Sequence, residues 1–452
     1  MNLHGARIHL HRYGSRLQDA AQQLLESERW SEEAVTRVQD RLLSDLISTA
    51  YAKSPFYRQV MQERGLTPDD VATVQDLARL PLLTKDQVKT ESARIVTRPR
   101  PGPGWVHGHT SGTTGSPLGL WYDRHTCIMT NAVERRHKAW AGMTGADWVG
   151  LFLGRVVVPL RETHPPFWRA NGVQRQVWFS SFHMSDESLG AYVREISRRG
   201  LRFLEGYPST LFVLARYVRR HVGCLPMTAV FTSSETLLPT QREEIEGAFA
   251  CPLFDFYGLA ERVAFAGECE AHSGKHVASE YSIVEVVDDD GNPVPDGVEG
   301  YLVGTSLHNA AMPMIRYRTA DRTALSRELC GCGRTLPRIR DVTTKAEDIL
   351  MTPDGRKISP SVLTHPFKPL DAIEASQIIQ RELDRITVRL VVRDAEFTGG
   401  MEAQLRSGLL ERLGSSVKVD FEYVSAIPRT ASGKFRWVVS TLRHDASVKF
   451  ED

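Results

Sequence analysis

A run of hydroxyls and glycines at residues 109–117, His-Thr-Ser-Gly-Thr-Thr-Gly-Ser-Pro, is the first stretch that could do chemistry. Glycines let the backbone turn where a side chain would clash, and hydroxyls with exposed N–H groups can surround an anion. Such a loop suits a polyphosphate, although a solvated surface loop has the same composition. The Gly-Lys-Ser/Thr ending of a Walker loop is missing, so hydroxyls and backbone donors must hold any nucleotide. The candidate binding residues are Thr110, Ser111, Gly112, Thr113, Thr114 and Gly115.

Two later stretches could hold the rest of a nucleotide. Residues 256–261, Phe-Tyr-Gly-Leu-Ala-Glu, follow a predicted strand, and ligands of open α/β sheets bind beyond the carboxyl ends of strands. Tyr257 offers a flat face for a purine, and Glu261 could hold Mg²⁺, which prefers oxygen ligands. A strand followed by a helix cap is the alternative. Asp321, expected to follow a strand, could accept both ribose hydroxyls, unless it only pairs with an arginine on a surface strand.

A fourth stretch lies near the end of the chain. Residues 428–434, Pro-Arg-Thr-Ala-Ser-Gly-Lys, present Lys434 on a loop of small residues. An exposed tail loop would have the same composition. The stretch is therefore a candidate only in combination with the other three.

The elements that must position these stretches predict an α/β protein. Residues 1–100 show apolar positions at helical spacing, with Ser31 as a helix N-cap. From residue 118 to residue 256, strand-like and helical runs alternate, which is typical of a parallel sheet with helices on its faces. The alternating runs 281–287 and 301–305 predict an antiparallel hairpin in a β-subdomain.

The chain beyond residue 344 predicts a second, smaller domain. A strand over residues 386–392, a helix over 401–413 and a strand over 417–424 would form a compact α+β unit. We expect a large N-terminal domain at 1–343, mainly helical over 1–100 and α/β plus β-subdomain over 101–343. A small, mobile C-terminal domain at 344–452 would carry Lys434.

Composition excludes several classes of protein. The 452 residues are 41% hydrophobic and 25% charged with a net charge of +1, which gives no electrostatic footprint for nucleic acid. No run approaches the roughly 20 apolar residues of a membrane span. The N-terminus lacks a signal-peptide core. Arg7, Arg12 and Arg16 leave an organelle transit segment open, but the cytoplasm is the favoured location. A homodimer is left open.

Together the four stretches resemble the motifs of the adenylate-forming superfamily, which contains acyl- and aryl-CoA ligases, nonribosomal-peptide adenylation domains and luciferases. A narrower resemblance, to the phenylacetate–CoA ligase group and its capsule-associated relatives, covers about residues 51–434. It rests on residues 54–57 (Ser-Pro-Phe-Tyr), 80–85 (Leu-Pro-Leu-Leu-Thr-Lys), 206–209 (Gly-Tyr-Pro-Ser) and 313–317 (Pro-Met-Ile-Arg-Tyr).

The resemblance gives three of the six cysteines a meaning. It implies a structural zinc bound by a Cys-x6-His and a later Cys-x-Cys, which suits thiolates with one imidazole in a closed tetrahedral set. His272 in the same loop is a competing ligand, and three free thiols are the alternative. The implied ligands are Cys269, His276, Cys330 and Cys332.

The chain departs from the superfamily pattern at two places. The hinge between the domains usually reads Gly-Arg-x-Asp-Asp, but residues 344–348 read Thr-Lys-Ala-Glu-Asp. Lys345 keeps the charge of the arginine without its bidentate fork. In place of a Gly-Glu before the nucleotide, the chain has Ser234 and Glu235 after another serine.

The resemblance implies a reaction in two halves. A small-molecule carboxylic acid attacks the α-phosphate of Mg·ATP to give an acyl-adenylate, and a thiol, most simply that of coenzyme A, then displaces AMP. Residues 110–115 would hold the β- and γ-phosphates, Ser234 and Glu235 would line the adenine pocket, and Tyr257 with Gly258 would lie against adenine. Asp321 would bind ribose. Glu261 and Lys434 would be catalytic, the first through Mg²⁺ and the second at the α-phosphate.

Other outcomes of the same adenylate stay open. An amine or hydroxyl acceptor would give an amide or ester, as in polysaccharide or secondary-metabolite tailoring, and a variant would transfer AMP to a coenzyme. A non-catalytic nucleotide-binding scaffold is the alternative of another class. The acyl pocket is expected between residues 150 and 207 and near Tyr257. An aryl or arylacetic acid is the first expectation, and a sugar acid or amino acid the second.

Overall fold

A computed structural model describes most of the chain, in the following residues: 16–102, 104–109, 118–153, 155, 157–159, 162–181, 183–342, 350–353, 357–358, 363, 365–367, 370, 372–393, 396–428 and 436–442. The chain divides into two compact units, one of residues 1–237 with 243–342 and one of residues 343–452 with 238–242. No helix in these residues is long and apolar enough to cross a membrane.

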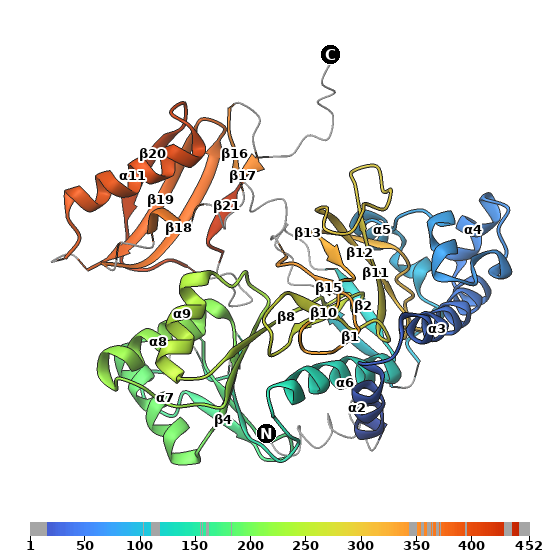
Figure 1. The fold of residues 1–452 in the computed structure, drawn as a ribbon, viewed down its shortest axis with the longest axis horizontal. Helices are drawn as coiled ribbons and strands as arrows, with labels where there is room; N and C mark the ends of the chain where they lie inside the picture. Colours follow the sequence, from blue (N-terminus) through green and yellow to red (C-terminus); the bar gives the residue numbers. More distant parts are fainter. Residues whose placement is uncertain are drawn as a thin grey trace. The chain divides into compact units, whose positions relative to one another are not determined.

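A ten-stranded sheet forms the centre of the large unit (Figure 1), in the order β14-β15-β10-β9-β8-β7-β6-β3-β5-β4. Its middle is parallel, as the alternating pattern predicts, and consists of β3 (Val149–Phe152), β5 (Gln176–Phe179), β6 (Phe203–Gly206), β7 (Ala229–Ser233) and β8 (Leu253–Gly258). Antiparallel strands extend it at both ends: β4 (Trp168–Asn171), β9 (Phe265–Glu268), β10 (Lys275–Val277), β15 (Arg338–Ile339) and β14 (Leu325–Ser326).

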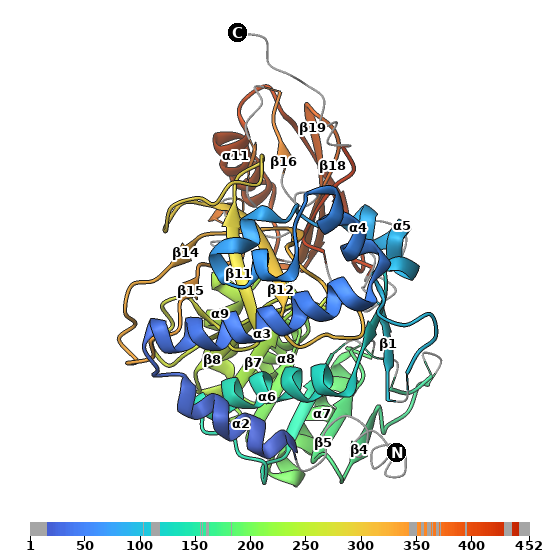
Figure 2. The same cartoon turned by 90° about the vertical axis from the view of Figure 1, so that its right-hand side faces the viewer.

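Helices cover both faces of this sheet. Every residue of β3, β6 and β7 is buried, as expected for parallel strands covered on both sides. One face packs against α7 (Asp186–Arg199), α8 (Pro208–His221) and α9 (Pro239–Phe249). The other faces α6 (Arg124–Trp140), whose His137 contacts Phe231, Phe254 and Phe256. Helix α2 (Arg16–Ser27) packs beside α6 (Figure 2).

The rest of the large unit is a helical segment and a small antiparallel sheet. The helices are α3 (Glu32–Lys53), α4 (Pro55–Glu63) and α5 (Lys85–Ile95), with the 3₁₀ turns η2 (Pro68–Val71) and η3 (Val74–Arg79). Ser31 caps α3 as predicted, since its Oγ accepts a hydrogen bond from the Ala34 N–H at 3.3 Å. The predicted hairpin is β11 (Ser282–Val287) with β12 (Gly300–Ser306).

A third strand, β13 (Tyr317–Thr323), pairs with β12. The expectation that Asp321 follows a strand is therefore wrong, because Asp321 lies within β13. The strand is hard to recognise from the sequence because its buried positions after Tyr317 are the polar residues Thr319, Asp321 and Thr323. A further hairpin joins β1 (Val106–His109) to β2 (Gly119–Tyr122).

The small unit is α+β, as predicted. A four-stranded sheet has the order β20-β19-β18-β21, from β18 (Ile373–Glu382), β19 (Arg385–Val392), β20 (Lys418–Tyr423) and β21 (Val438–Ser440). The helix α11 (Gly399–Leu413) buries Leu405, Leu409 and Leu413 in a core shared with these strands (Figure 1). A short hairpin, β16 (Leu350–Met351) with β17 (Lys357–Ile358), and the turn η5 (His365–Phe367) complete it.

Candidate active site and metal centre

Four of the predicted nucleotide residues lie at the carboxyl edge of the central sheet. Ser234 and Glu235 directly follow β7, and Tyr257 and Gly258 are the last two residues of β8. Strands β7 and β8 are parallel neighbours in register from Val230 to Ser233, so both pairs reach the same edge. Ligands of open α/β sheets bind beyond this edge.

The turn after β7 is held by an unusual backbone and a helix cap. Ser234 has a φ of 69°, in the left-handed region that costs an L-residue about 1–2 kcal/mol. The turn brings the Glu235 carboxylate to the first turn of α8, where its Oε2 accepts a hydrogen bond from the Ser209 N–H at 3.0 Å. The positive end of a helix suits a carboxylate. Glu235 thus holds α8 in place, and its part in an adenine pocket stays a prediction.

Tyr257 and Asp321 meet although they are far apart in sequence. The Tyr257 hydroxyl donates a hydrogen bond to Asp321 Oδ2 at 2.7 Å, from β8 to β13. Burial, and then the charge of Asp321, raise the pKa of Tyr257 well above its ordinary value, so the phenol remains a donor. Only 8% of Asp321 is exposed. The pair fixes both the ring plane and the carboxylate, and Asp321 retains capacity to accept further hydrogen bonds.

A second phenol orients the predicted Mg²⁺ ligand. The Tyr317 hydroxyl donates to Glu261 Oε1 at 3.0 Å, and burial followed by the charge of Glu261 raises the pKa of Tyr317. Each of the two carboxylates thus has one oxygen bonded to a tyrosine. The charges of both Glu261 and Asp321 act on Tyr257 and on Tyr317, so the four side chains form one polar group.

Tyr317 is positioned by segments that the sequence marked only through the family resemblance. Buried Tyr57 donates its hydroxyl hydrogen to the Pro313 carbonyl at 3.0 Å and accepts from the Ile315 N–H at 3.1 Å. Leu83 bonds through its backbone to Arg316 and Arg318 on either side of Tyr317. Residues 54–57, 80–85 and 313–317 thus support one another. Tyr317 is a site residue that the sequence did not predict, although it lies in residues 313–317, one of the segments that carry the family resemblance.

Several predicted residues fall outside the described part of the chain. They are Thr110, Ser111, Gly112, Thr113, Thr114, Gly115, Lys345 and Lys434. The phosphate-loop, hinge and lysine predictions therefore remain sequence predictions. The hairpin of β1 and β2 flanks the first of these segments.

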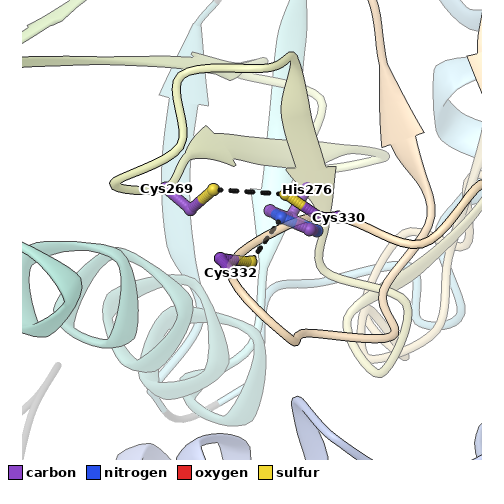
Figure 3. A group of neighbouring side chains, drawn as sticks. All are labelled: Cys269, His276, Cys330 and Cys332. Atoms are coloured by element: carbon purple, nitrogen blue, oxygen red, sulfur yellow. Dashed lines mark hydrogen bonds between the residues drawn. The ribbon is translucent and has the colours of Figure 1, made fainter.

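The predicted zinc ligands come together at the β9–β10 end of the large unit (Figure 3). Ligand atoms of Cys269, His276, Cys330 and Cys332 all lie within 4.8 Å of one another. Cys269 Sγ is 3.7 Å from Cys330 Sγ, and Cys332 Sγ is 3.4 Å from His276 Nε2. Sulfurs bound tetrahedrally to Zn²⁺ at about 2.3 Å would be about 3.8 Å apart. Both the donor set and the spacing fit this ion.

The second nitrogen of His276 supports the same arrangement. Its Nδ1–H donates to the Leu336 carbonyl at 2.9 Å, which leaves the Nε2 lone pair facing the thiols. Burial lowers the pKa of His276 to about 4, so the ring is neutral as a metal ligand must be. His272, the competing ligand, instead has its Nδ1 3.2 Å from Glu268 Oε2 and is outside the group of four.

Comparisons with known proteins point in one direction. Residues 350–441 match the model of the CapK C-terminal domain. The chain is 26% identical to Protein CapK of Staphylococcus aureus, over 90% of this chain and 89% of that protein. It is 25% identical to a phenylacetate-coenzyme A ligase of Thermus thermophilus, over 90% of this chain and 96% of that protein.

A solved structure shares the fold. A 2-hydroxyisobutyryl-CoA ligase, crystallised in its postadenylation state with an acyl-AMP, aligns with a TM-score of 0.71 at 21% identity. The alignment covers 89% of this chain and 88% of that one. At this identity the likeness shows the fold and leaves the chemistry to the site residues.

Proposed function

We propose that this chain is an AMP-forming acid–thiol ligase. The premise is that it belongs to the adenylate-forming superfamily and to its group of phenylacetate–CoA ligases and CapK proteins. It activates a carboxylic acid with ATP and passes the acyl group to coenzyme A. The observation that carries the proposal is the pairing of Tyr257 with Asp321 and of Tyr317 with Glu261 at the carboxyl edge of the sheet.

The first half-reaction joins the acid to AMP. A carboxylate oxygen attacks the α-phosphorus, the new P–O bond forms, and the bond to the β-phosphate oxygen breaks to release pyrophosphate. Asp321 accepts hydrogen bonds from the ribose hydroxyls, and the face of Tyr257 lies against adenine. Lys434 and the hydroxyl loop at residues 110–115 neutralise charge on the phosphates. Mg²⁺, when bound through Glu261, supplies further neutralisation. The protein's contribution is positioning and electrostatics, not covalent chemistry.

The second half-reaction releases AMP. The thiol gives up its proton to solvent, its sulfur attacks the acyl carbon to form the C–S bond, and the bond from that carbon to the phosphate oxygen breaks, with AMP as the leaving group. The domain that carries Lys434 moves away before the thiol attacks, while Asp321 and Tyr257 continue to hold the AMP part of the adenylate. Lys345 and the neighbouring acidic pair would form the hinge for that motion, which makes the small unit a lid.

The metal centre is part of the proposal in a structural role. A closed Cys₃His set leaves no position for substrate, so the zinc stabilises the fold and takes no part in the reaction. Its thiolates need a reducing compartment, which is consistent with the proposed cytoplasmic location.

A second candidate function keeps the adenylate and changes the acceptor. The match of residues 350–441 to the CapK C-terminal domain supports it, because the unit that we propose to move for the second half-reaction matches a protein that is not named as a CoA ligase. An amine or hydroxyl would then replace the thiol and yield an amide or an ester.

Product formation distinguishes the two candidates. Purified protein with Mg²⁺ and ATP is given a panel of carboxylic acids, and pyrophosphate release and acyl products are followed with coenzyme A, with amines and with no acceptor. We expect turnover to depend on the acid and to rise with coenzyme A, with an acyl-CoA as the product. Turnover that rises only with an amine or alcohol would establish the second candidate, and no acid-dependent release would refute both.

A further inference from the structure

The face of the central sheet that α6 covers carries charged groups within an apolar core. The apolar core on this face consists of Val149, Leu151, Phe203, Ala229, Phe231 and Phe254. Glu205 of β6 lies between two of these residues, in register with Leu151 on one side and Phe231 on the other, and is only 6% exposed. A carboxylate buried in an apolar core needs a partner of opposite charge.

Two residues of α6 complete a charged group around Glu205. Lys138 Nζ lies 2.7 Å from Glu205 Oε2, and the two side chains are 18% and 8% exposed. Glu134 lies one helical turn before Lys138, and the charges of Lys138, Glu205 and Arg262 all act on it. Among the residues that the structure describes, no hydrogen bond or ion pair to the Glu134 carboxylate is found. Glu134 therefore has the capacity to accept a donor from a ligand.

Arg262 connects this charged group to the nucleotide site. Arg262 directly follows Glu261, and its Nη1 donates to Thr130 Oγ1 on α6 at 2.6 Å, one turn before Glu134. Glu205 is the last residue but one of β6, so it approaches the same carboxyl edge as Ser234 and Tyr257. Arg262 therefore connects the nucleotide carboxylates to α6, on which Glu134 and Lys138 follow Thr130 by one and two helical turns.

We infer that Glu134, Lys138 and Glu205 form the polar end of the acyl site and select a carboxylic acid whose chain carries a hydrogen-bond donor, either a hydroxyl or an ammonium group. The inference rests on the proposed function and narrows its substrate class. An unsubstituted aryl or alkyl chain would cover these charges without satisfying them, which is costly in a buried site. A site built to hydrogen-bond a substituent discriminates strongly against the analogue that lacks it.

Matched acids on a common carbon frame test the inference. Acid-dependent ATP–pyrophosphate exchange is measured with phenylacetate, para-hydroxyphenylacetate and para-aminomethylphenylacetate, and with butyrate, gamma-hydroxybutyrate and gamma-aminobutyrate. We expect kcat/KM for a substituted acid to exceed that for its parent by at least about tenfold, the effect of one hydrogen bond to a charged group. Glu134→Gln should reduce that ratio about tenfold or more, and more for the ammonium acid than for the hydroxy acid.

Two further measurements keep the outcome clear. Glu187→Gln, an exposed change on α7, is the matched control and should leave the ratio as it is. Binding of the corresponding acyl-sulfamoyl adenosines, measured by calorimetry, should show the same preference without catalysis. Exchange that is best with the parent acids, or a ratio that Glu134→Gln leaves unchanged, would overturn the inference and leave the proposed function standing. No exchange with any acid and no binding of any analogue would refute both.

Discussion

At the scale of single residues, the two tyrosine–carboxylate pairs decide what the site can bind. Each phenol holds one carboxylate oxygen, so the second oxygen of Asp321 and of Glu261 is oriented before a ligand arrives. Such preorganisation reduces the ordering that binding must impose. The two members of each pair are more than fifty residues apart in the sequence, which is why the sequence predicts them as site residues without showing that they touch.

Asp321→Asn should weaken nucleotide binding. An amide accepts fewer and weaker hydrogen bonds from ribose hydroxyls than a carboxylate, and the loss of a charge-assisted bond is worth about 1.5–3 kcal/mol. We expect calorimetry to give a dissociation constant for ATP raised about tenfold to a hundredfold. Asp289→Asn, on a side chain that is 79% exposed, is the control and should bind like the unaltered protein. Equal affinities for both variants would show that Asp321 does not contact the ribose.

Ser234→Gly should stabilise the protein. Glycine adopts the left-handed φ of 69° without strain, so the change should raise the free energy of unfolding by about 1 kcal/mol. Urea unfolding measures it. Ser233→Gly, at the last residue of β7, which is not among the residues with a positive φ, should instead destabilise the protein. A Ser234→Gly variant that is less stable than the parent would mean that the serine side chain outweighs the backbone strain.

At the scale of elements, the segment that follows the predicted zinc ligand Cys332 joins three parts of the large unit. Arg334, two residues after Cys332, bonds to Glu270 at 2.8 Å and lies 3.3 Å from Glu28 in the turn between α2 and α3. Its guanidinium also lies 4.5 Å from the centre of the Trp140 ring at the end of α6. These contacts of Arg334 therefore connect the segment of the predicted zinc ligands to α6, the helix that carries Glu134 and Lys138.

Removal of the metal should loosen these contacts. We expect about one zinc per chain by elemental analysis, and a chelator or Cys332→Ser should remove it and lower the melting temperature by several degrees. Hydrogen exchange should then speed up around residues 24–31 and at the end of α6. Cys224→Ser, at an exposed thiol, is the matched control. Protein that is free of metal as isolated and equally stable with chelator would refute the zinc centre.

The elements also show how far sequence reasoning reaches. The sequence predicts strands β6, β7 and β8 because short strand-like runs that alternate with helical ones are typical of a parallel sheet. Strands β9 and β10 were missed, since they have only four and three residues and include Glu268, Lys275 and His276. Those polar residues are tolerated because the structure pairs them, for example Lys275 with Asp255 at 3.2 Å. A single sequence shows the composition of such strands and not the partners that make them stable.

The same limit applies within the site. The order of the motifs predicted the candidate residues, but the left-handed turn at Ser234 and the cap of α8 by Glu235 depend on contacts between segments. The charged group around Glu205 could not be predicted either, because the basic residues next to Lys138 in the sequence are typical of a solvated helix face. Its burial follows from the packing of α6 on the sheet.

At the scale of the whole molecule, buried histidines make stability depend on pH. Burial lowers the pKa of His137 to about 3 and of His308 to about 4, both below the unfolded value near 6.5. Between these values the unfolded state binds more protons, so stability falls as the pH falls. Each of the two histidines should lower the free energy of unfolding by on the order of 2 kcal/mol between pH 6.5 and 5. Asp255, whose pKa burial raises to about 6, opposes this with about 1 kcal/mol.

Urea unfolding at pH 7.5 and pH 5 measures this dependence. We expect a net loss of about 3 kcal/mol at the lower pH. His308→Gln keeps a donor for the Glu280 carbonyl and should remove about 2 kcal/mol of the loss. His221→Gln, at a partly exposed ring, should leave it unchanged. If His308→Gln and the parent lost the same free energy, His308 would not be the titrating group.

The division of the chain into two units puts the predicted catalytic lysine and the nucleotide pairs on different bodies. Asp321 and Glu261 belong to the large unit and Lys434 to the small one. Adenylation would need both, whereas thioester formation from a finished adenylate would need only the large unit's nucleotide contacts. The two half-reactions should therefore differ in their dependence on Lys434.

Acid-dependent ATP–pyrophosphate exchange in the absence of any thiol, compared between the parent chain and Lys434→Ala, tests that claim most directly. We predict exchange that requires a carboxylic acid in the parent and falls about a thousandfold in the variant, as expected for one unit charge removed from the α-phosphate. The variant should still convert a supplied acyl-adenylate to the thioester. Exchange without any acid, or equal exchange in both proteins, would contradict the account.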